Sequence, residues 1–287
     1  MPNDFTREMY VQSSLPLNST ISSEQFVQML KMYNNDKHKH TFIIQIRNYV
    51  IDLQPSDFRE SIGLFKNDHS KNFQFVYCMY KKIKSVDTSE IIKCLMLYTS
   101  DMGRFFFASS CFNRFVPISG NILVDFLKVH IDDQYKTHFV SIALDKIINI
   151  NLDDLIISLK TYRSDEGKQS FVLAAKKRLK IDQLEFKSLR ECFDPENDYY
   201  FNTVLNTLIK IYLSDGKIIN ISDLFASINS ASEACKFELA LDFAKNILID
   251  DNSAITQHIK NEQLVDSLYE YYDKFNYLTK VKTVHNI

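Results

Sequence analysis

Apolar side chains recur along most of this chain with a period of about 32 residues. If the first apolar residue of each copy is counted as position 0, further apolar residues recur at positions 5, 9 and 12, with His130 and Arg190 as exceptions. A period in this range is typical of an array of stacked structural repeats. The copies begin at Ile21, Leu53, Val86, Ile118, Ile150, Ile181 and Ile219.

Each copy contains the pattern of two amphipathic helices. Positions 5, 9 and 12 are spaced four and three residues apart, so they share one face of a first helix. Polar residues at positions 13 to 15 then interrupt the apolar pattern, and Asp or Asn at that place is typical of an N-cap. A second apolar face follows, as at Phe42, Ile46 and Val50. One hairpin cannot bury both faces alone, so the sequence predicts an all-α fold, a right-handed α-solenoid of seven to eight stacked helical hairpins.

The same 32-residue spacing predicts where the repeats and the terminal segments begin and end. Residues 1–20 are predicted to form a lead-in helix and a linker, and residues 252–287 a capping half-repeat. Pro55 and Pro117 lie at repeat boundaries, whereas Gly63 is the one glycine that falls inside a predicted helix. The predicted repeats are 21–52, 53–85, 86–117, 118–149, 150–180, 181–218 and 219–251.

A four-residue motif surrounds the turn of several hairpins. An aromatic residue, an acid, a base and a phenylalanine occupy positions 12, 15, 18 and 21, as in Tyr33, Asp36, Lys39 and Phe42. The third and fifth repeats keep all four residue types, while the second has Gln74 at position 21. This motif resembles a little-characterised family of tandem helical hairpins, a domain of unknown function found in bacterial envelope proteins and in animal proline- and serine-rich proteins. The resemblance covers roughly residues 20–250 and implies an all-helical interaction domain, without any catalytic residue to transfer.

The acids and bases of this motif form a ladder along the array. The acids are Asp36, Asp68, Asp101, Asp133 and Asp165, and the bases are Lys39, Lys71, Arg104, Lys136 and Lys168. The favoured interpretation is structural: each Asp caps its second helix, and each base pairs with an Asp of its own or the neighbouring repeat. The alternative is a row of cations that binds an acidic peptide or a phosphate backbone, which makes the five bases candidate binding residues. Tyr269 and Tyr272 in the C-terminal segment are further candidates, as aromatic anchors for a partner or as a seal on the open end.

Composition and other candidate chemistry narrow the function. A net charge of −2 argues against a general binder of polyanions. His38, His40 and His69 are candidate metal ligands, but His38 and His40 are two residues apart and so lie on different faces of a helix, and no metal site is predicted. No nucleotide, hydrolase, protease or zinc motif is present, so we expect neither a cofactor nor an enzyme. The five cysteines are predicted to be buried and reduced. No apolar run approaches the length of a membrane span and no signal peptide is evident, so an intracellular location, cytoplasmic or nuclear, is expected.

The leading hypothesis is a non-catalytic protein–protein interaction scaffold whose protein partner the sequence does not identify. A nucleic-acid-binding helical-repeat protein is the alternative, because basic clusters at 81–84 and 176–180 end two second helices. Cations at those ends also complement the helix dipole without any ligand. An enzyme with an unrecognised site is the least favoured class.

Overall fold

The computed structural model describes residues 3–14, 20–194 and 198–215, and all of its regular elements are helices. The prediction of an all-α fold is thereby confirmed for the described residues. The helices before residue 150 are α1 (Asp4–Ser14), α2 (Ser23–Lys31), α3 (Asp36–Ile46), α4 (Pro55–Gly63), η1 (Ser70–Val76), α5 (Tyr77–Met79), η2 (Tyr80–Lys82), α6 (Thr88–Met96), α7 (Asp101–Cys111), η3 (Phe112–Arg114), α8 (Gly120–Val129) and α9 (Asp133–Ala143). The helices after residue 150 are α10 (Leu152–Leu159), α11 (Asp165–Ala175), η4 (Lys176–Arg178), α12 (Phe186–Arg190) and α13 (Asp198–Ser214).

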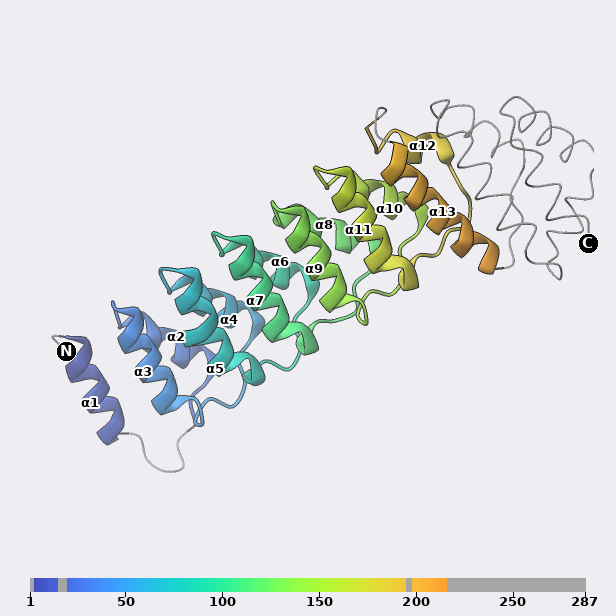
Figure 1. Ribbon diagram of the computed structural model, residues 1–287. Helices are drawn as coiled ribbons and strands as arrows, with labels where there is room; N and C mark the ends of the chain where they lie inside the picture. The colour runs from blue at the N-terminus through green and yellow to red at the C-terminus, as the bar shows by residue number, and fades with distance from the viewer. Residues whose placement is uncertain (1–2, 15–19, 195–197, 216–287) are drawn as a thin grey trace, which may run out of the picture. The chain divides into compact units, whose positions relative to one another are not determined.

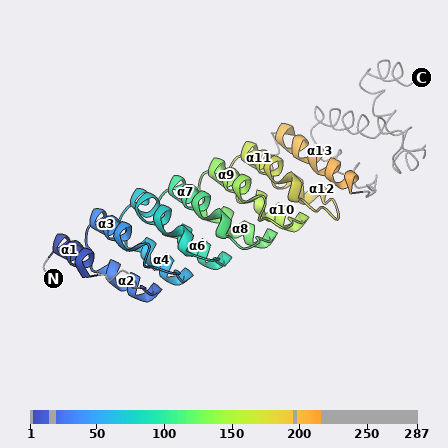
Figure 2. The same cartoon turned by 90° about the horizontal axis from the view of Figure 1, so that it is seen from below.

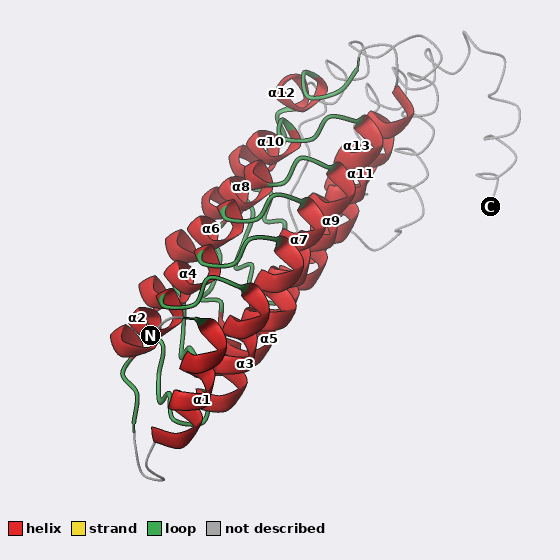
Figure 3. Cartoon of the chain, turned by 90° about the vertical axis from the view of Figure 1, so that its left-hand side faces the viewer, coloured by secondary structure: helices red, strands yellow, loops and turns green. Residues whose placement is uncertain are grey.

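The chain divides into two units, residues 1–149 and 150–287, which are described separately. In the first unit, the first helices of the hairpins (α2, α4, α6 and α8) pack against one another in chain order (Figures 1 and 2). The second helices form another layer in which α1, α3, η1, α7 and α9 contact one another in the same order (Figure 3). In the second unit, α11 packs against α13. Sequential contacts of this kind are those of stacked helical hairpins.

The second helices begin at polar caps in the turn of each hairpin. The capping side chains belong to Asn35, Ser100, Asp132 and Ser164, and each accepts a hydrogen bond from a backbone N–H in the first turn of its helix. These residues stand at position 14, one residue before the ladder aspartates. The prediction that the aspartates themselves cap their own helices was therefore wrong by one residue.

The open end of each hairpin is closed by backbone hydrogen bonds. Ile21, which starts the first repeat, forms an isolated parallel bridge with Val50 at its end, and Val86 and Ile118 do the same with Phe115 and Ile147. In the second unit, Ile150 pairs in this way with Leu179. Both side chains of every bridge are buried. The apolar residue that marks each start in the sequence thus ties the two ends of one hairpin together.

Aromatic rings make the core continuous from one hairpin to the next. Phe26 of α2 stacks on Phe42 of its own hairpin and on Phe75 of the next, with ring centroids 6.3 Å apart in both pairs. Phe58 of α4 lies 5.1 Å from Phe75 and 6.5 Å from Phe107. These five rings are all buried. Burying each contributes about 1.5–3 kcal/mol, so the strongest apolar contacts bind neighbours as well as partners within a hairpin.

The second repeat is one residue longer, and a π-helix absorbs the extra residue. The segment η1 (Ser70–Val76) is a π-helix, whereas the same part of the other hairpins is α-helical. The added residue moves the core phenylalanine from position 21, where Gln74 stands, to Phe75, which is fully buried. It also turns Asn72 inward, where its side-chain amide donates to the carbonyl of Gly103 at 2.9 Å. The phenylalanine that the sequence motif lacks at Gln74 is present one residue later.

The predicted seventh repeat (219–251) and the capping half-repeat (252–287) lie outside the described residues. No helix within the described part of the chain is long and apolar enough to cross a lipid bilayer.

Candidate interaction surface

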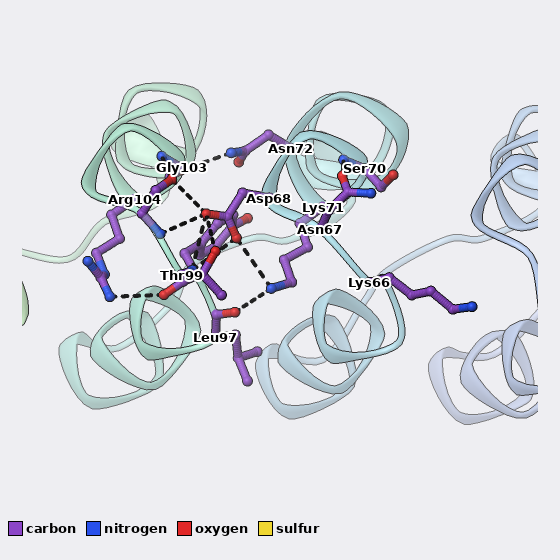
Figure 4. Close-up of polar contacts among 12 residues, drawn as sticks. Lys66, Asn67, Asp68, Ser70, Lys71, Asn72, Leu97, Thr99, Gly103 and Arg104 are labelled. Carbon is purple, nitrogen blue, oxygen red and sulfur yellow. Dashed lines mark hydrogen bonds and ion pairs between the residues drawn. The ribbon is translucent and has the colours of Figure 1, made fainter.

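The ladder aspartates bind the turn of the hairpin that follows them. Asp36 accepts a hydrogen bond from the backbone N–H of Lys66 at 3.0 Å. Asp68 accepts from the N–H groups of Thr99 at 3.0 Å and Ser100 at 2.8 Å, and from both of their hydroxyls (Figure 4). Asp101 and Asp165 repeat the contact at Ile131, Asp132 and Asp194. Each carboxylate thereby satisfies N–H groups that the next turn leaves without partners in its own hairpin.

The bases complete this contact from the carbonyl side. Lys39 forms an ion pair with Asp36 at 3.2 Å and donates to the carbonyl of Leu64 in the next hairpin at 2.6 Å. Lys71 pairs with Asp68 at 3.4 Å and donates to the carbonyl of Leu97 (Figure 4). Their ammonium groups also lie over an aromatic ring of the next hairpin, Phe65 at 5.5 Å and Tyr98 at 5.4 Å. We call this set of contacts the turn clasp.

The turn clasp places the five predicted cations in the interior. Relative exposure is 4% for Lys39, 5% for Lys71, 3% for Lys136 and 9% for Lys168, and the Arg104 side chain is 11% exposed. All five pair with the aspartate three residues before them. The pairing within each repeat was predicted, and the burial favours the structural interpretation of the ladder. Its ligand-binding role stays a prediction, as does that of Tyr269 and Tyr272, which lie outside the described residues.

Hydrogen bonding keeps the carboxylates of Asp68 and Asp101 charged. Burial alone would raise the pKa of Asp68, but the N–H and O–H donors of Thr99 and Ser100 outweigh it and hold the pKa below its ordinary value. Burial opposes a lowered pKa at Asp101 as well, where the N–H groups of Asp132 and Ile131 and the Arg104 guanidinium prevail.

Helix α1 makes the same clasp with the first hairpin. Asp4 accepts from the N–H groups of Asn34 and Asn35, both at 3.1 Å, and pairs with Arg7 at 2.9 Å. Arg7 in turn donates to the carbonyl of Met32. The predicted lead-in helix is therefore the second helix of an N-terminal half-repeat. The signal was present in the sequence, because Asp4, Arg7 and Tyr10 carry the acid, base and aromatic at the ladder spacing.

A row of aromatic side chains crosses the outer surface of three second helices in the first unit. His69 contacts Phe73 with ring centroids 4.8 Å apart, Phe73 contacts Phe106 at 5.7 Å, and Phe106 contacts Phe105 at 6.0 Å. Phe105 then contacts two side chains of α9, Tyr135 at 6.1 Å and His138 at 5.7 Å. We call these six residues the aromatic strip: His69, Phe73, Phe105, Phe106, Tyr135 and His138.

The aromatic strip faces solvent. Phe73 is 47% exposed and Phe106 is 39% exposed, and both histidines are exposed as well. Tyr77, one turn further along the same segment as Phe73, is 69% exposed. A contiguous group of exposed rings marks an interaction surface more often than scattered apolar side chains do. The repeat pattern did not predict this surface, because its rings occupy positions that are aromatic in only some hairpins.

Among the described residues, His38, His40 and His69 do not converge on one metal site. His69 belongs to the aromatic strip, and His40 has its Nε2 atom 4.0 Å from the Sγ atom of Cys78. Burial raises the pKa of Cys78 and lowers that of His40, so both groups are held in their neutral forms at neutral pH. Among the described residues, no three His, Cys, Asp or Glu side chains converge as a metal site requires.

His130 replaces the aromatic residue of the fourth turn. Its side chain is fully buried and stacks on Phe139 at 5.8 Å. Its Nδ1 atom is 3.6 Å from Asp101, which is longer than a hydrogen bond, and neither ring nitrogen has a hydrogen-bond partner among the described residues. Burial lowers the pKa of His130 to about 4. Arg104, the base that precedes this turn, donates instead to the carbonyl of Tyr98 in its own hairpin.

Comparison of the chain with protein-family models, with curated proteins and with solved structures finds no match.

Proposed function

We propose that this chain is a right-handed α-solenoid of seven to eight hairpins that acts as a non-catalytic protein–protein interaction scaffold. The hairpin contacts within the first unit support the solenoid, since its first helices pack on first helices and its second helices on second helices. The resemblance to the tandem-hairpin family and an intracellular location remain predictions that agree with this proposal.

The aromatic strip is the observation that carries the proposal. Its rings cost free energy while they remain in water, and aromatic side chains are enriched among the residues that dominate protein interfaces. The acidic and basic side chains at the hairpin turns already bind the neighbouring hairpin through the turn clasp. The outer surface of the second helices is therefore the better place for a partner.

The test is affinity capture with the intact chain. The immobilised full-length protein should retain one or more proteins from a lysate, and the same proteins should remain after nuclease treatment. Loss of every captured protein on nuclease treatment would contradict the scaffold.

One observation favours nucleic-acid binding as a second candidate. The residue before the closing bridge is a cation in two hairpins of the first unit, Arg114 and Lys146. Lys82 stands at the matching place in the second repeat, where its carbonyl accepts from Leu53. Such a row could follow a phosphate backbone, in which case oligothymidine binding should weaken steeply with added salt. Salt-independent or absent binding would eliminate this candidate.

A further inference from the structure

The turn clasp between the third and fourth hairpins differs from the two clasps before it. At this junction α6 packs on α8 and α7 packs on α9 (Figure 2). At the earlier junctions Lys39 and Lys71 each donate to a backbone carbonyl of the hairpin that follows them. Arg104, the corresponding base, donates instead to the carbonyl of Tyr98 in its own hairpin at 2.9 Å. The base therefore holds its own turn here, and the Asp101 carboxylate holds the next one.

His130 lies at the centre of this junction, in the position that a tyrosine or a phenylalanine occupies in the other described hairpins. Its side chain is fully buried, and its Nδ1 atom lies 3.6 Å from the Oδ1 atom of Asp101. That oxygen already accepts from Arg104 at 2.6 Å. The other oxygen of Asp101 accepts from the N–H groups of Ile131 at 2.8 Å and Asp132 at 2.7 Å. Both oxygens of the nearest carboxylate are therefore occupied, and a proton on the imidazole would have to displace one of these donors.

The charges around His130 are balanced while its ring is neutral. Within the described part of the chain, the charged side chains that face it are Asp101 and Arg104 of α7 and Lys136 of α9. Arg104 pairs with Asp101 at 2.6 Å, and Lys136 pairs with Asp133 at 3.1 Å. A proton on His130 would add a buried positive charge beside two cations that already have their partners. Desolvation therefore outweighs the attraction of Asp101 and lowers the pKa of His130 to about 4.

We propose that the contact between the third and fourth hairpins is an acid-sensitive joint, which opens in mildly acidic solution when His130 takes a proton while the two earlier clasps stay closed. Stacked repeats are held by contacts between nearest neighbours, so one junction can weaken by itself. The aromatic strip crosses this joint, because Phe105 of α7 contacts Tyr135 and His138 of α9. Acid would therefore separate these rings and release a partner bound across them. This release rests on the proposed scaffold function, whereas the joint itself does not.

The test is amide hydrogen exchange of the full-length protein, resolved to single residues at pH 7.5, 6 and 5 and corrected for the intrinsic effect of pH. The N–H groups of Ile131 and Asp132, which Asp101 holds, report on the joint. Those of Thr99 and Ser100, which Asp68 holds in the same way, are the internal reference. Protection at the joint relative to the reference should fall about thirtyfold between pH 7.5 and 5. This ratio follows from a His130 pKa of about 4 in the closed form and 6.5 in the open form.

Substitution of the histidine should remove the effect. The variants His130→Phe and His130→Tyr carry the residue types that occupy this position in other hairpins, and their relative protection should stay constant with pH. The matched control is His138→Gln, which replaces an exposed histidine on α9 at the same junction and should keep the thirtyfold loss. A second control is His40→Gln, since burial lowers the pKa of His40 as well but this residue belongs to the first hairpin. It should also keep the loss at the joint.

Three results would overturn the joint. They are an unchanged ratio in the parent protein, an equal loss of protection at both turns, or a pH-dependent ratio that persists in both His130 variants. The exchange measurement involves no partner, so any of these results would leave lysate capture by the intact protein as separate support for the scaffold. Failure of the scaffold would instead show as the absence of any nuclease-resistant protein in that capture, with the exchange result unaffected.

Discussion

Replacing His130 with phenylalanine should remove a pH-dependent loss of stability from the fourth hairpin. Burial holds the pKa of His130 at about 4 in the folded chain, against an ordinary value of 6.5. The unfolded chain therefore binds a proton between these values while the folded chain does not. Stability is unaffected above pH 6.5, falls as the pH drops towards 4, and stops falling below it.

The size of the effect follows from the same two values. One pKa unit corresponds to about 1.4 kcal/mol, so the parent protein should lose about 2 kcal/mol at pH 5 and about 3 kcal/mol at pH 4 from this residue. Phenylalanine cannot take a proton, and Phe65 and Phe193 show that it fits the same position in other hairpins. At neutral pH the substitution should be neutral or stabilising, because it removes two ring nitrogens that are buried without hydrogen bonds.

The assay is urea unfolding of the parent and the His130→Phe variant, followed by far-UV circular dichroism at pH 7.5, 6 and 5. The difference in unfolding free energy between the two proteins should grow in favour of the variant as the pH falls. Other titrating groups, including His40, are common to both proteins and largely cancel in the difference. Parallel pH profiles for the two proteins would refute the assignment of a buried, neutral His130.

The remaining predictions concern the turn clasp and two glycines. Asp68→Ala should destabilise the chain by about 3 kcal/mol in urea unfolding, because it leaves buried Lys71 and the N–H groups of the next turn without their partner. The control Asp125→Ala breaks an exposed ion pair and should cost less than about 0.5 kcal/mol, so equal effects of the two variants would argue against the clasp. Gly103→Ala should cost about 1–3 kcal/mol, because the added Cβ would lie 2.5 Å from an Asp68 oxygen that is held by four donors. In Gly63→Ala the added Cβ has its nearest neighbour 4.0 Å away, so this variant should stabilise helix α4 by up to about 1 kcal/mol. In thermal unfolding the two glycine variants should therefore shift the melting temperature in opposite directions, and shifts in the same direction would contradict the packing.

The helical hairpins could be predicted because every copy repeats the same burial pattern. Phe26, Phe58 and Ile91 all stand at position 5, and all are buried in the structure. A periodic signal averages over the copies, so single exceptions such as His130 do not hide it. The all-α architecture and its sequential helix contacts followed from this pattern alone.

The details that failed depend on single-residue shifts and on tertiary contacts. The aspartates were placed as caps, yet Asn35 and Ser100 occupy the cap position and the aspartates follow them by one residue. The π-helix moved the core ring from Gln74 to Phe75, a change that the longer spacing of the second repeat could have indicated. That a clasp carboxylate reaches forward to the next turn was not encoded in its local spacing.

The aromatic strip could not be found from periodicity, and the reason is general. Positions that repeat in every hairpin are those that the fold needs, whereas Phe73, Phe106 and Tyr135 occupy outward positions that differ between copies. A surface that recognises a particular partner has no reason to repeat. Departures from the repeat on the outer face are therefore the better guide to a binding site in such a chain.

The forward direction of the turn clasp has a consequence for where this protein can be cut. Asp4 and Arg7 serve the turn between α2 and α3, and Asp68 serves the turn before α7, so each hairpin depends on the helix that precedes it. The segment that folds cooperatively therefore runs from one second helix to the next first helix, whereas the repeat in the sequence begins at a first helix. Fragments that start at a second helix should fold more readily than fragments that start at a first helix, even when both contain the same number of residues.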